Sequence, residues 1–128
     1  MKRKKEFLSA VYTALRDALP DSIKIFPHVP EIDDVHDTYI WFIIISAQEQ
    51  ALGDTTNILF DINILSDSLN EAMDLESMVY AVLHRQSLSL TTATNLYVQA
   101  LSSAYFTEEI AGVKKIRYVI TFTGRVIE

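Results

Sequence analysis

The chain has 128 residues, of which 49% are hydrophobic, with only three glycines and three prolines; this composition predicts one globular domain over residues 1–128 and excludes a disordered chain. Cysteine is absent, which excludes disulfide staples and thiolate chemistry and fits a reducing cytoplasm. The net charge of −6 is uneven, because no Lys or Arg lies between Lys24 and Arg85 while eleven acidic residues do, so the middle is unsuited to binding nucleic acid.

Residues 6–19 have the apolar spacing of an amphipathic helix, with Phe7, Val11 and Leu15 on one side and a proline after the last turn. The four cations at 2–5 are unfavourable at the positive end of a helix dipole, so we expect them to fray or to bind an acidic partner. The amphipathic pattern differs from the apolar core of a secretory signal. No later stretch is long enough to span a membrane.

Residues 23–26 predict a strand. It is expected to be short, because Pro27 and Pro30 lack the backbone N–H that a longer ladder of hydrogen bonds needs. The loop after this strand carries the densest cluster of possible metal ligands: Glu31, Asp33, Asp34, His36 and Asp37. The glycine turn and final glutamate of a calcium loop are absent, and His28 and His36 lack the spacing of zinc ligands. We therefore expect a solvated loop that binds no divalent metal tightly.

Residues 39–47 are the most apolar run, with Tyr39 and Trp41 on one face of a strand and Ile40 and Phe42 on the other. A strand that is apolar on both faces is typically central and covered on both sides, here by helices or by another subunit. The polar connection that follows, at 48–56, is longer than a tight hairpin turn. It is expected to project from the domain.

The segment from residue 57 to residue 85 organises the chain. Its first half predicts a half-buried strand, because Asp61 and Asn63 share one face and the other is apolar, with Ile58, Phe60, Ile62 and Ile64. The period then becomes helical. Ser68 and Glu71 have the spacing of a capping box, which predicts a helix start directly after the strand.

The rest of the chain is mainly extended. A Ser/Thr-rich connection at 86–95 leads to an alternating strand at 96–105, a turn at residues 111–112 and a long strand at 115–126. The order of elements is therefore α-β-β-β-α-β-β. It predicts an α+β domain whose mainly antiparallel sheet of four to five strands carries two helices on one face.

Catalytic motifs are absent, since the chain has neither a Gly-x-Ser-x-Gly elbow nor a glycine-rich phosphate loop. His84 falls near the end of the predicted helix, where the dipole favours a cation, so a structural role explains it best. Asp61 and Asn63 can flank a pocket, which leaves a small α+β ligand-binding domain or enzyme as an alternative function. A third hypothesis is an interaction module that binds one partner in fixed stoichiometry.

Several segments together resemble the tail-completion or tail-terminator proteins of long-tailed bacteriophages and prophages, minor tail proteins that act in head-to-tail joining. The resemblance spans nearly the whole chain. The segments that carry it are Leu-Arg-Asp-Ala-Leu at 15–19, Val-Pro at 29–30, the strand at 39–45, Phe-Asp-Ile-Asn-Ile at 60–64 with Ser-Asp at 66–67, the helix at 78–83 and Arg-Tyr-Val-Ile-Thr-Phe at 117–122.

The resemblance implies a structural protein, not an enzyme, that needs no cofactor or metal and forms a hexameric ring. Such a ring caps the finished tail tube and gives the head connector of the neck a surface on which to dock. The implied partners are other copies of the chain, the tail-tube protein and the head connector, with no membrane. The implied location is the tail or neck of the virion, and the host cytoplasm during assembly. DNA only passes through the lumen, which acidic side chains would keep free of bound DNA.

A ring requires a heterologous interface, in which one patch of each subunit meets a different patch of the next. The acidic middle and the basic flanks of this chain are one source of such complementarity. We expect the interface to include the 48–56 connection, the sheet edges and the polar face of the following strand, with the residues Gln48, Glu49, Gln50, Leu52, Asp54, Asp61 and Asn63.

Overall fold

A computed structural model describes residues 2–28, 38–49, 55–91, 93–110 and 112–127 of the chain. The elements follow the predicted order α-β-β-β-α-β-β. Their bounds are α1 Lys2–Ala18, β1 Lys24–Phe26, β2 Tyr39–Glu49, β3 Thr55–Ser66, α2 Leu69–Leu83, β4 Thr94–Ile110 and β5 Val113–Ile127.

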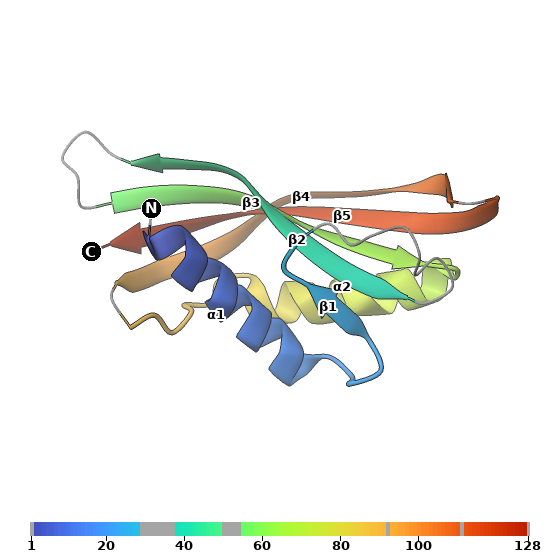
Figure 1. The fold of residues 1–128 in the computed structure, drawn as a ribbon, viewed down its shortest axis with the longest axis horizontal. Coiled ribbons are helices and arrows are strands. Elements are labelled where there is room, and N and C mark those ends of the chain that lie inside the picture. The colour runs from blue at the N-terminus through green and yellow to red at the C-terminus, as the bar shows by residue number, and fades with distance from the viewer. Residues whose placement is uncertain (1, 29–37, 50–54, 92, 111, 128) are drawn as a thin grey trace.

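The five strands form one twisted sheet in the order β1-β2-β3-β5-β4. All neighbouring strands are antiparallel except β1 and β2, which are parallel. Both helices lie on the same side of this sheet (Figure 1). The predicted α+β class, strand number and one-sided helix layer are therefore confirmed, with the addition that the sheet is mixed.

Helix α1 begins earlier than predicted. The basic residues after Met1 are helical, and α1 runs from Lys2 with no acidic residue in its first turn. The expectation that these cations fray is therefore wrong for the backbone. Lys and Arg are good helix formers, and one turn of unfavourable dipole contact costs only a few tenths of a kcal/mol to about 1 kcal/mol per charge.

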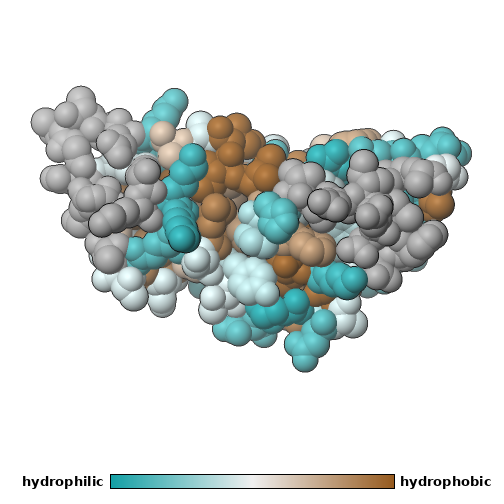
Figure 2. All heavy atoms as spheres, viewed as in Figure 1, coloured by the Kyte–Doolittle hydropathy of each residue, from teal (hydrophilic) through white to brown (hydrophobic). Residues whose placement is uncertain are grey.

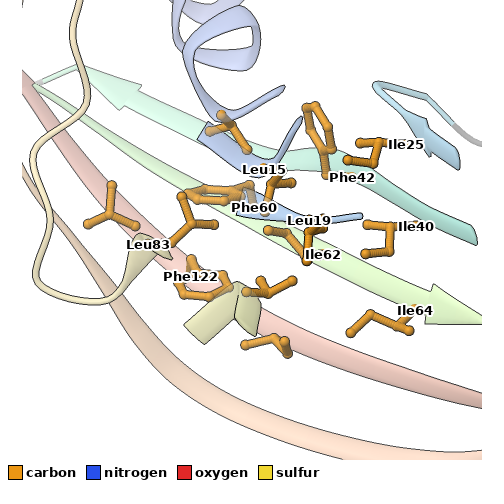
Figure 3. Close-up of a cluster of buried hydrophobic side chains, with 14 of the residues drawn as sticks. Leu15, Leu19, Ile25, Ile40, Phe42, Phe60, Ile62, Ile64, Leu83 and Phe122 are labelled. Atoms are coloured by element: carbon orange, nitrogen blue, oxygen red, sulfur yellow. The ribbon is translucent and has the colours of Figure 1, made fainter. Parts of the chain in front are cut away.

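The core lies between the helices and the sheet. The even-numbered residues of β3 from Ile58 to Ile64 are fully buried, as predicted from their alternation. The helices supply the facing side chains: Phe7, Val11, Leu15 and Leu19 from α1, and Ala72, Leu75, Val79 and Leu83 from α2. Figure 3 shows how side chains from α1, β2, β3 and β5 point into this shared interior.

One glycine fixes how closely α1 approaches the sheet. Gly124 of β5 pairs with Ile58 of β3, and its missing side chain leaves room for the ring of Phe7. A Cβ placed on Gly124 would lie 2.6 Å from Cζ of Phe7. The fully buried ring of Phe7 also meets Phe60 edge-on, with 5.3 Å between centroids. Gly124 therefore allows an aromatic contact between the first helix and the last strand.

The strand-to-helix junction at α2 is confirmed, with one change in detail. Ser68 is the N-cap, and its hydroxyl accepts a hydrogen bond from the Glu71 amide at 3.4 Å. The Glu71 carboxylate does not complete a capping box. It accepts hydrogen bonds from the hydroxyls of Ser66 and Thr38 instead, while the Ser68 amide donates to Ser66 at 3.1 Å. The cap thus also ties α2 to the start of β2.

The sequence predicted that β2 is the central strand of the sheet. In the structure it is instead second from one edge. Its two faces have different covers. Ile40 and Phe42 lie in the main core, whereas Tyr39 and Trp41 are buried on the opposite face in a small cluster with Leu65. Among the described residues, Phe26 packs against this cluster and the guanidinium of Arg117 lies over the ring of Trp41.

No helix in the described part of the chain has both the length and the apolar character to cross a membrane.

Candidate assembly surface

The face of the sheet opposite the helices is organised by Arg117 of β5. Its guanidinium carbon lies 5.1 Å from the ring centre of Trp41 and 5.5 Å from that of Phe106. Cation–π contacts of this kind contribute about 0.5–1 kcal/mol where water has access and more where it is excluded. From its position on β5, Arg117 therefore contacts an aromatic ring of β4, the adjacent strand, and one of β2, which lies beyond β3. These contacts link three strands of this face.

Several polar side chains of the same face are paired with one another. Arg117 Nε donates to Asn63 Oδ1 at 3.1 Å, and Arg117 Nη1 lies 3.4 Å from Glu108 Oε1. The Thr121 hydroxyl donates to Asp61 Oδ1 at 2.7 Å. Asn63 is itself only 2% exposed. One oxygen of each residue is therefore already engaged within the sheet, and Asn63 has almost no surface to offer a ligand, which disfavours the alternative of a pocket beside them.

Two open grooves lie on the helix side of the molecule instead. One, of about 480 Å³, runs between α1 and the 86–91 segment, where the Glu6 carboxylate accepts hydrogen bonds from Thr91. The other, of about 540 Å³, lies beside α1 and includes Tyr12 and Ile25. Neither groove is lined by Asp61 or Asn63.

Strand β2 has an edge that is only partly paired. Strand β1 pairs with Tyr39–Trp41 of β2 and then ends. From residue 43 to residue 49, no strand among the described residues pairs with this edge of β2. A free edge presents a row of unpaired N–H and C=O groups to other chains.

Strand β4 forms the opposite edge of the sheet, and it is covered over its first half only. The amide of Arg85 donates to the Val98 carbonyl at 2.7 Å, and the Val98 amide donates to the Gln86 carbonyl at 2.9 Å. The amide of Ala100 donates to Nδ1 of His84 at 3.0 Å. Beyond Ala100, β4 pairs only with β5 among the described residues. This second free edge extends over residues 102–109.

His84 has a structural role, as predicted, but it fills this role through specific contacts. It is the C-cap of α2, and its amide donates to the Tyr80 carbonyl at 2.8 Å. Its imidazole stacks on Tyr80 with 4.4 Å between centroids and accepts the Ala100 amide. His84 thus joins the end of α2 to the edge strand, and a structural role is confirmed.

Apolar side chains accumulate beside both free edges. On β2, Ile43 is 37% exposed and Ile45 is 50% exposed. On β4, Leu101, Tyr105 and Phe106 are each about half exposed. Figure 2 shows hydrophobic atoms at the surface where β2 crosses the middle of the molecule. Exposed apolar patches of this kind mark interaction sites in soluble proteins.

The predicted interface residues divide into three groups. Gln48 is exposed on β2, beside the free edge, and the backbone of Glu49 ends that strand. Asp61 and Asn63 lie on the helix-free face with their polar groups paired. Gln50, Leu52 and Asp54 lie outside the described residues, and the connection that contains them is shorter than expected because β2 and β3 extend into the predicted 48–56 segment.

The acidic loop from residue 31 to residue 37 also lies outside the described residues. Among the residues that are described, no group of three His, Cys, Asp or Glu side chains is arranged to hold a metal ion.

Sequence comparisons find no match, either with a family model or with a curated protein. A comparison of structures does find matches. The fold matches a chain of the structure described as "Virion of native gene transfer agent (GTA) particle", with a TM-score of 0.71, 15% sequence identity, and coverage of 98% of this chain and 97% of that chain. The two chains share their fold over essentially their whole lengths.

Proposed function

We propose that this protein is a structural component of a phage-like virion that forms a hexameric ring, caps the tail tube and joins it to the head connector. The observation that carries the proposal is the full-length structural likeness to a chain of a gene transfer agent virion, with a TM-score of 0.71. The segments that resemble tail-terminator proteins lie in or directly beside α1, β2, β3, α2 and β5, except for Val-Pro at 29–30, which lies outside the described residues.

The shape of the sheet supports self-assembly. A heterologous ring needs two different patches that face roughly opposite directions on each subunit. The free stretches of β2 and β4 meet this condition, because they belong to opposite edges of the sheet and lie toward opposite ends of the long axis of the molecule (Figure 1). Closing the ring would leave neither edge open to uncontrolled aggregation.

The proposal makes the protein non-enzymatic, with the tail-tube protein and the head connector as its partners and the virion tail or neck as its location. DNA would pass through the ring without being bound. The paired state of Asp61 and Asn63 favours this structural role over the ligand-binding alternative. The interface would include Gln48 and Glu49 at the end of β2, together with Gln50, Leu52 and Asp54 in the connection that follows.

The direct test is to mix the purified protein with purified tail tubes and to examine the tube ends by negative-stain electron microscopy. The expected result is a ring of six copies at one end of each tube. Light scattering across concentration measures whether the ring also forms without tubes. A protein that stays monomeric at millimolar concentration and leaves every tube end bare would refute the proposal.

A further inference from the structure

We propose that the free edge of β4 in one copy adds to the free edge of β2 in the next, so that the sheet continues from subunit to subunit. The pairing would join residues 102–109 of one copy to residues 43–48 of its neighbour in antiparallel orientation. This inference rests on the proposed ring and names the contact that closes it. The occupant of each edge is a second copy of the same chain.

The orientation follows from the sheet order. Strand β2 is antiparallel to β3, β3 to β5, and β5 to β4, so β2 and β4 run in opposite directions within one copy. Two neighbouring copies whose sheets run in the same direction therefore bring β4 of one beside β2 of the other in antiparallel alignment. Strand β1 blocks only Tyr39–Trp41 of the receiving strand. Contact with the neighbouring copy is therefore directed to the second half of β2.

The backbone of β4 is oriented for such pairing. The Ala100 amide points away from β5, since it donates to His84, and Ala100 is the register partner of Phe122. Backbone groups alternate along an antiparallel ladder. The β4 partners of Ile120, Tyr118 and Ile116 therefore also point their amides outward, and these partners are Ser103, Tyr105 and Thr107. Three donors with their carbonyls thus face the next copy.

The side chains at the two edges are matched in character. Neither free stretch contains a proline or a lysine, two devices by which proteins block sheet edges. Ile43 and Ile45 would come to lie beside Tyr105 and Phe106 of the neighbouring copy, all of them at least 37% exposed in the single chain. Strand addition would thus bury apolar surface on both faces of the joined sheet, in addition to forming main-chain hydrogen bonds.

The positions of the edges also determine how the copies are offset. The free part of β4 lies toward the β4–β5 turn, whereas the free part of β2 lies at the other end of the sheet. Pairing them shifts each copy along the strand direction relative to the last. A stagger repeated around a closed ring tilts the strands against the ring axis, as in closed barrels.

The absence of native cysteine allows a direct test by disulfide crosslinking. Ser46 is paired with Leu59, which places it on the helix-free face, and the same face of β4 carries Ser102 and Ala104, the partners of Thr121 and Val119. The test variants combine Ser46→Cys with Ser102→Cys or with Ala104→Cys. The matched control combines Ser46→Cys with Ser103→Cys, whose side chain lies on the helix face, and each single cysteine variant is a further control.

The crosslink reports contacts between copies only. Within one copy, three strand spacings of about 4.8 Å separate β2 from β4, which gives about 14 Å, whereas a disulfide needs its Cα atoms within about 7 Å. Mild oxidation is applied at rising protein concentration, with and without tail tubes. The expected result for at least one helix-free-face pair is a ladder of covalent oligomers that ends at six copies. The Ser103→Cys control is expected to form dimers at most.

Failure of the inference and failure of the proposed function give different results. Two results would overturn the strand pairing and leave the ring intact. In the first, rings form at tube ends but neither helix-free-face pair gives a ladder of crosslinked oligomers. In the second, the Ser103→Cys control gives an equal ladder. A specific ladder in a protein that never binds tube ends would support the pairing and overturn the tail function. A monomer without any crosslink at millimolar concentration would overturn the pairing.

Discussion

The contact between Gly124 and Phe7 makes the substitution Gly124→Ala an informative perturbation. The new Cβ would lie 2.6 Å from Cζ of Phe7, whereas carbon atoms in favourable contact lie about 3.5–4.0 Å apart. The ring would have to retreat by about 1 Å. It cannot do so freely, because Phe7 is fully buried and meets Phe60, which itself stacks on Phe122 with 5.4 Å between centroids.

The expected magnitude follows from two opposing effects. Overpacking a closed core typically costs about 1–3 kcal/mol, while replacing glycine by alanine within a strand gains about 0.5–1 kcal/mol from reduced backbone entropy. The free energy of unfolding should therefore fall by about 1–2 kcal/mol. Denaturant melts followed by circular dichroism measure this change. Thr123→Ala, on the helix-free face of the same strand, is the control for loss of strand stability without a clash.

A double-mutant cycle separates the clash from other effects. Phe7→Leu removes the far end of the ring, so Gly124→Ala should cost less in the Phe7→Leu background than in the wild type. The coupling free energy is expected to reach about 1 kcal/mol, within the range for residues in contact. Equal costs in both backgrounds, or a Gly124→Ala protein as stable as the wild type, would refute the argument that Phe7 requires this glycine.

Three further predictions concern separate features. Ser68→Ala should lower the free energy of unfolding by about 0.5–1 kcal/mol through loss of the N-cap of α2, and an unchanged denaturant midpoint would show that the cap is not needed. Burial raises the pKa of Glu76 above its ordinary value of 4.5, so the folded state loses stability as the pH rises and Glu76 ionises. The free energy of unfolding of Glu76→Gln should therefore increase relative to that of the wild type as the pH rises above this value, which paired melts across pH measure. The loop at 31–37 should show no micromolar binding of calcium, magnesium or zinc by calorimetry; a tight site lost on Asp34→Ala and His36→Ala would contradict this.

The sequence was most informative where one physical pattern dominated. Alternation in β3 and helical spacing in α2 each follow from a single buried face, and both elements were found where predicted. The strand ends were harder to predict, because Gln48 and Thr94 are polar and join the sheet through backbone hydrogen bonds rather than burial. The strand predicted at 96–105 continues to Ile110, where the charged residues Glu108 and Glu109 join the sheet through pairing with β5.

The candidate assembly surface was less accessible to sequence reasoning. Arg117 falls within the strand predicted at 115–126, but its partners Trp41 and Asn63 are more than fifty residues away in the chain. Which edges stay free depends on where β1 stops pairing and on the cover that the 84–86 segment gives to β4. The apolar run Leu101, Tyr105 and Phe106 next to serines was the one available signal of an exposed edge.

The position of β5 within the sheet has a consequence for synthesis of the protein. Strand β5 follows all other described elements in the chain, yet it lies between β3 and β4. About 60 residues separate the end of β3 from the end of β5, which corresponds to roughly 3–12 s of translation at 5–20 residues per second. During this time β3 lacks one neighbour, and β4, once it has been translated, has no neighbouring strand until β5 follows. A nascent chain therefore cannot present a paired β4 edge, and in the proposed ring only chains translated through β5 could take a place.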